Sequence, residues 1–150
     1  MVRKLVVLAF GVVVAGSVTA AAVDWKPVVD PYLKIQTALA GDSLDGVAAG
    51  AAAVATAAAK LGAAGAPVAE AATRMGAASD IKAARTLFMD LSETLIKAAG
   101  ESLASDVRIA YCPMVKKHWL QTDKEIRNPY YGNQMLECGR IVEGIPETLQ

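Results

Sequence analysis

The stretch from residue 81 to residue 98 reads IKAARTLFMDLSETLIKA, and it decides the fold class that the sequence predicts. Its apolar residues recur at alternating steps of three and four, namely at Ile81, Ala84, Phe88, Leu91, Leu95 and Ala98. This spacing puts one apolar stripe along a single face of an α-helix. Asp80 is a suitable N-cap residue, and Gly100 suits the end of the helix. We therefore expect a long amphipathic helix between these two residues.

Three further stretches before it carry the same period. Their apolar positions are Val28, Tyr32, Ile35 and Leu39; Leu44, Val47, Ala51, Val54, Ala58 and Leu61; and Val68, Ala71, Ala72 and Met75. Asp42 or Ser43 can cap the second helix, and Gly62, Gly65 and Pro67 separate it from the third. Four helices with short links predict an all-α fold, an antiparallel up-and-down four-helix bundle.

The alanine-rich character stops after residue 110, and the segment 111–140 is built differently. Pro113 and Pro129 interrupt helices, because each lacks a backbone donor and restrains the residue before it. We expect an irregular Cys- and Met-containing segment here, attached to the bundle within one domain that spans residues 23–150.

Other side chains are assigned structural roles. We expect Trp119, Tyr130 and Tyr131 to pack against the edge of the core, as amphipathic aromatic side chains usually do. Arg85 and Asp90 are interpreted as solvated or capping charges.

The first 22 residues have the three-part order of a secretory signal peptide. Arg3 and Lys4 precede an apolar run at residues 5–14, and small residues follow as far as Ala22. We expect cleavage after Ala20 or Ala22. The alternative is an uncleaved membrane anchor, for which the apolar run is short. The expected product is a periplasmic protein with no stable membrane span after cleavage.

Charge and motif content exclude several classes of function. Loss of Arg3 and Lys4 leaves 13 basic residues against 15 acidic ones, a net charge of −2. Without a basic run, nucleic acid is a poor partner. The chain has one histidine, no G-x-S-x-G elbow, no P-loop and no G-x-G-x-x-G, and we therefore expect no enzymatic activity.

The residues suited to soft-metal chemistry gather between residues 112 and 138. Cys112 and Met114 are two positions apart, and Met135 and Cys138 are three apart, the spacing that places two side chains on one face of a helical turn. Thiolate and thioether sulfur are soft ligands that favour Cu(I), and imidazole also binds copper. We expect a Cu(I)-type metal site drawn from Cys112, Met114, His118, Met135 and Cys138.

The two cysteines also fit a disulfide, which is common in exported proteins. A bond between Cys112 and Cys138 would close a loop of about 25 residues and stabilise the fold by about 3 kcal/mol. The residues alone leave both interpretations open. In the disulfide interpretation, the bond between the cysteines stabilises a structural or interaction module of the cell envelope.

An ordered set of motifs resembles a bacterial exported domain of unknown function. The motifs are Tyr32-Leu33-Lys34-Ile35-Gln36, Cys112-Pro113-Met114, Trp119-Leu120, Asn128-Pro129-Tyr130-Tyr131-Gly132 and Met135-Leu136-Glu137-Cys138-Gly139. That domain occurs alone and appended to periplasmic adaptor subunits of CusB-type heavy-metal efflux systems. The resemblance spans residues 28–142. It implies a helical bundle, an exported location, a link to copper or related metals and an efflux adaptor as partner, and it implies no enzymatic activity.

Overall fold

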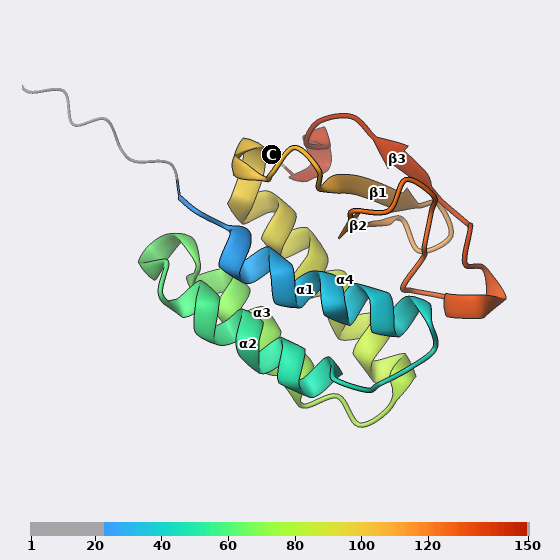
Figure 1. The fold of residues 1–150 in the computed structure, drawn as a ribbon, viewed down its shortest axis with the longest axis horizontal. Coiled ribbons are helices and arrows are strands. Elements are labelled where there is room, and N and C mark those ends of the chain that lie inside the picture. Colours follow the sequence, from blue (N-terminus) through green and yellow to red (C-terminus); the bar gives the residue numbers. More distant parts are fainter. Residues whose placement is uncertain (1–22, 150) are drawn as a thin grey trace, which may run out of the picture.

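A computed structural model describes residues 23–149, in which four α-helices precede a three-stranded sheet (Figure 1). The helices are α1 (Lys26–Ala40), α2 (Val47–Ala59), α3 (Ala66–Gly76) and α4 (Ile81–Ala99). The expected helices are confirmed, and consecutive ones pack against each other. Their predicted stripes form the buried faces, and Phe88 and Leu91 of α4 have no exposed surface. Leu44 is an exception, because it lies before α2 and is 40% exposed.

One of the two predicted N-caps is confirmed. The side chain of Asp80 accepts a hydrogen bond from the Ala83 N–H over 2.9 Å and caps α4. The cap expected at Asp42 or Ser43 is wrong. α2 begins only at Val47, and Gly46 precedes it without any side-chain cap.

The all-α prediction is wrong, because residues 108–142, which include the segment expected to be irregular, form a three-stranded antiparallel sheet. Its strands are β1 (Arg108–Cys112), β2 (Lys117–Gln121) and β3 (Arg140–Val142). The fold is therefore mixed, with helices followed by strands. β2 is nearly buried along its whole length and shows no polar–apolar alternation, and β3 has only three residues. Strands of this kind lack the period of two by which a half-buried strand is recognised.

The sheet has the order β2-β1-β3, and both pairings are antiparallel. β2 is an edge strand that lies against α4 and α1, and β3 forms the outer edge (Figure 1). Two tyrosine hydroxyls form hydrogen bonds with backbone groups on the free edge of β2. The Leu120 N–H donates to the Tyr32 hydroxyl over 3.1 Å, and the Tyr130 hydroxyl donates to the His118 carbonyl. Burial raises the pKa of both tyrosines above the ordinary value, so both hydroxyls stay protonated.

One continuous core joins the helices to the sheet. The Tyr32 and Phe88 rings stack with centroids 4.8 Å apart, and Tyr130 lies 6.3 Å from Phe88. The Tyr130 ring meets Trp119 of β2 edge-on at 5.6 Å. Trp119 and Tyr130 thus lie within the core, deeper than the core edge predicted for them, whereas the half-buried Tyr131 packs against the core as predicted.

The expected signal peptide lies outside the described residues. Among the helices between residues 23 and 149, none is long and apolar enough to cross a bilayer.

Candidate functional site

The five predicted metal ligands lie on and around the sheet. Cys112 is the last residue of β1, and His118 is the second residue of β2. Met114 lies in the turn between these strands and is 59% exposed. Met135 follows the short 3-10 helix η3 (Gly132–Gln134), and Cys138 precedes β3. Cys112 is fully buried, Cys138 is half-buried, and both are free thiols.

The pairing of β1 with β3 brings the two cysteines to the same end of the sheet. The last pair between β1 and β3 is that of Tyr111 with Arg140. Cys112 directly follows Tyr111 on β1, and Cys138 lies two residues before Arg140 in the segment that leads into β3. Because the strands are antiparallel, both segments leave the sheet at the same end. The close approach continues beyond the last pair, since a Cβ on Gly139 would lie 2.9 Å from the Tyr111 carbonyl oxygen.

His118 lies on the opposite face of the sheet from Cys112. Cys112 pairs with Lys117, whereas His118 pairs with Tyr111, and successive side chains of a strand point to opposite faces. The His118 Nδ1 is 3.5 Å from the Glu93 carboxylate of α4, and its ring centroid is 4.9 Å from that of Tyr111. The structure therefore does not bring His118 to the thiols.

Among residues 23–149, no third histidine, cysteine or carboxylate completes a metal site with the two cysteines. Within the part of the chain that the structure describes, no group of three or more His, Cys, Asp or Glu side chains could hold a metal ion. A site at Cys112 and Cys138 would therefore need the thioether of Met114 or Met135 as a further ligand. Thiolates with thioethers form the donor set that selects Cu(I).

Asn128 fixes the segment that carries Cys138. It is completely buried, and its side-chain amide donates to the Cys138 carbonyl over 2.7 Å. Its side-chain oxygen accepts the Tyr130 N–H over 2.8 Å, and its own N–H donates to the Leu136 carbonyl over 2.7 Å. One buried amide thus holds both ends of the loop between residues 128 and 138.

Arg85 of α4 connects that loop to the turn after α1. Its Nε donates to the Pro129 carbonyl over 3.0 Å, and its Nη2 donates to the Leu39 carbonyl over 3.0 Å and forms an ion pair with Asp42. The Asn133 N–H donates to the same carboxylate over 3.0 Å. The hydrogen bond from Arg85, followed by that from Asn133, holds the pKa of Asp42 below its ordinary value. Arg85 is therefore not a solvated charge, whereas its hydrogen bond to Leu39, one of the last carbonyls of α1, fits the capping role that was the other predicted alternative.

Comparison with known proteins identifies a family. Residues 28–106 match the family described as protein of unknown function DUF3347, which covers more than half of the chain. The chain belongs to the DUF3347 family. No curated protein and no solved structure matches this DUF3347 protein.

The DUF3347 match contains the helices but none of the five candidate ligands. It ends two residues before β1, whereas the first candidate ligand is Cys112. The matched region nevertheless supplies the side chains that hold the following segment, among them Tyr32 and Arg85. Sequence reasoning missed these roles. A lone arginine between apolar helix positions carries no local sign that Asp42, 43 residues away, will pair with it.

Proposed function

We propose that this DUF3347 protein is an exported soft-metal-binding protein, and that Cys112 and Cys138 are the central ligands of a Cu(I)-type ion. The observation that carries the proposal is the β1–β3 pairing, which brings two free thiols to one end of the sheet. Met114 and Met135 lie beside these cysteines in sequence and supply the further sulfur ligands. His118 is outside the proposed ligand set, because it lies on the other face.

Burial of the Cys112 thiol and exposure of the neighbouring Met114 support this assignment. A metal ion bound at Cys112 would be shielded from water, since this residue has no exposed surface. Met114, at 59% exposed, is the ligand that solvent or a partner protein reaches. The resemblance found in the sequence extends the proposal to location and partner. We infer that the protein acts in the periplasm and serves an adaptor subunit of a heavy-metal efflux system.

The experiment is a titration of the reduced protein with Cu(I) in competition with a coloured chelator. We expect one bound ion per chain. Binding should be lost in the Cys112→Ser, Cys138→Ser double variant and weakened in Met114→Leu or Met135→Leu. Met89→Leu is the matched control, because Met89 lies on α4, outside the segment 112–138 that carries the candidate ligands. The His118→Ala variant should retain its copper.

Full retention of copper in the double cysteine variant would refute the thiolate site. Loss of copper in His118→Ala, with the fold intact by circular dichroism, would show that the ligand assignment is wrong.

A second candidate, a structural module of the cell envelope, is favoured by the complete burial of Cys112 and by its location near Cys138 at one end of the sheet. In this case the two thiols form a disulfide staple. Thiol counting on protein isolated from the envelope without reductant distinguishes the two functions. Two reactive thiols after denaturation favour the metal site, and none favours the staple.

A further inference from the structure

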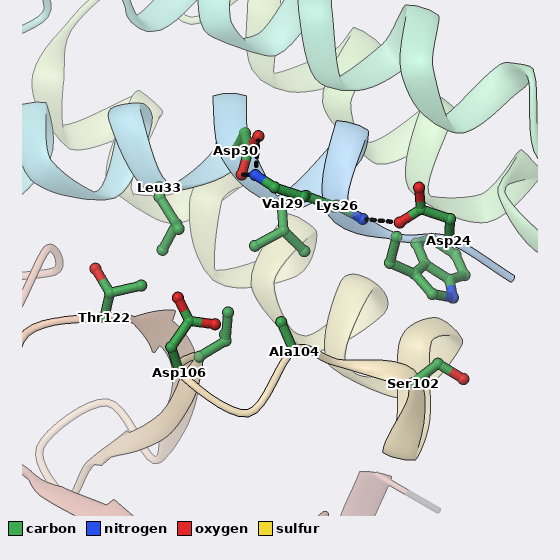
Figure 2. Close-up of a pocket in the computed structure, with 11 residues that line it drawn as sticks. Asp24, Lys26, Val29, Asp30, Leu33, Ser102, Ala104, Asp106 and Thr122 are labelled. Carbon is green, nitrogen blue, oxygen red and sulfur yellow. Dashed lines mark hydrogen bonds and ion pairs between the residues drawn. The ribbon is translucent and has the colours of Figure 1, made fainter. Parts of the chain in front are cut away.

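A small hollow lies at the opposite end of β1 from the cysteines, between the start of α1 and the segment that leads into β1 (Figure 2). Its volume is about 150 Å³. A cavity of about this volume holds a ligand the size of benzene. A ligand of a few heavy atoms is therefore the size that fits.

The floor of the hollow is apolar and well ordered by packing. Trp25 is 2% exposed and Val29 is 5% exposed, so both belong to the core as well as to the hollow. Figure 2 shows Val29 and Leu33 extending from α1 toward the segment that carries Ala104 and Asp106. Above this floor, the half-buried side chains of Leu33 and Val107 offer apolar contact to a short hydrocarbon chain.

The rim of the hollow is negatively charged. Three carboxylates line it, those of Asp24, Asp30 and Asp106, against one ammonium group, that of Lys26, so the lining has a net charge of −2. Lys26 is already engaged, because its Nζ lies 2.6 Å from an Asp30 carboxylate oxygen. Asp24 accepts the backbone N–H of Lys26 over 3.0 Å.

Asp106 is the exposed rim carboxylate that could meet a ligand, and its charge adds only a longer-range attraction to Lys26. Within residues 23–149 its side chain has no hydrogen bond and no ion pair, although it lines the hollow beside the apolar floor. An apolar lining next to a carboxylate that has only a longer-range attraction to Lys26 is complementary to an alkyl chain that ends in an ammonium group. A hydrated divalent metal ion would gain nothing from the contact with Leu33 and Val107.

We propose that this hollow binds a small organic ammonium ion, with its alkyl chain against Leu33 and Val107 and its charged group at Asp106. The proposal is independent of the metal site, because its residues lie at the other end of β1. A protein that binds no copper would therefore not contradict the ammonium site, and a protein that binds no ammonium ion would not contradict the copper site.

The test is a titration with n-butylammonium chloride, followed by the indole N–H signals of the two tryptophans in NMR spectra. The Trp25 signal should shift to saturation. The Trp119 signal should stay in place, since its Nε1 donates to the buried Gln121 side chain over 2.9 Å. Asp106→Asn should weaken binding about fivefold, as expected for loss of one partly exposed ion pair. Asp45→Asn is the matched control, an exposed carboxylate outside the hollow, and should bind as the unaltered protein does.

Uncharged and negatively charged probes of the same length complete the test. Sodium butyrate should not shift the Trp25 signal, 1-butanol should bind more weakly than n-butylammonium, and added salt should weaken n-butylammonium binding. Equal responses to butanol and n-butylammonium, or unchanged binding in Asp106→Asn, would overturn the proposal. Saturation by calcium chloride at lower concentration than n-butylammonium would reassign the hollow to a metal ion and equally refute it.

Discussion

The hydroxyl of Tyr32 accepts a hydrogen bond from the backbone N–H of Leu120 over 3.1 Å, and so joins α1 to the free edge of β2. The same hydroxyl lies 2.7 Å from the Ser92 hydroxyl of α4. An edge strand exposes unpaired backbone groups that need partners when they are buried. Tyr32 therefore links two helices and the sheet through one buried oxygen.

Replacement of Tyr32 by phenylalanine tests this link. The variant keeps the ring that stacks on Phe88 but leaves the Leu120 N–H and the Ser92 hydroxyl without this partner, so unfolding in urea should require about 1–3 kcal/mol less free energy. Tyr131→Phe is the control, because the Tyr131 hydroxyl has no hydrogen bond within residues 23–149. Equal stabilities of the two variants would contradict the role given to Tyr32.

Asp42 should make stability depend on pH on the acid side. Its folded-state pKa is held below the ordinary value of 3.8, chiefly by Arg85. The unfolded chain therefore binds the proton more readily, and the free energy of unfolding rises with pH in this range. The contribution is complete above pH 3.8 and disappears as pH falls through the lowered pKa. Urea unfolding of Asp42→Asn should show a flatter dependence on pH below about pH 4 than the unaltered protein.

Asp45→Asn is the comparison for this measurement, because Asp45 is exposed and outside the contact with Arg85. It should retain the dependence on pH. An identical profile for the Asp42 variant and the unaltered protein would mean that the ion pair with Arg85 contributes nothing in solution.

Gly132 is required both by its backbone angle and by its surroundings. Its φ is +56°, and a Cβ there would lie 2.1 Å from an Asp42 carboxylate oxygen and 2.3 Å from an Arg85 nitrogen. Gly144 has a similar φ of +69° with nothing within 4 Å of a Cβ, so it reports the backbone cost alone. Gly144→Ala should destabilise by about 1–2 kcal/mol. Gly132→Ala should cost more than that, because the clamp between Arg85 and Asp42 must also move. An equal decrease in melting temperature for the Gly132 and Gly144 variants would show that the Arg85–Asp42 ion pair moves aside at no cost in stability.

The helices could be predicted from sequence because each buries one face and leaves the other in water. Phe88, Leu91 and Leu95 return to one side of α4 at steps of three and four, a spacing that a β-strand does not produce. The sheet could not be predicted in this way. Trp119, Leu120 and Gln121 are consecutive in β2 and all fully buried, so the strand has no exposed face to mark its period.

The arrangement of the candidate ligands could not be predicted either, because it depends on the strands, which the sequence pattern does not mark. The spacing of Cys112 and Cys138 shows only that the two residues belong to one segment. Their approach follows from the pairing of Tyr111 with Arg140, a contact between residues far apart in sequence. The separation of His118 from Cys112 follows from strand alternation, which could be applied only once β1 and β2 were known.

X-ray absorption at the copper edge of the reduced protein, loaded with one equivalent of Cu(I), tests the central claim most directly. The first coordination shell should consist of sulfur alone, from Cys112, Cys138 and a methionine. The spectrum should be unchanged in His118→Ala, because strand alternation puts this side chain on the opposite face of the sheet from Cys112. A shell that contains nitrogen or oxygen, or a protein that retains no copper after gel filtration, would contradict the account.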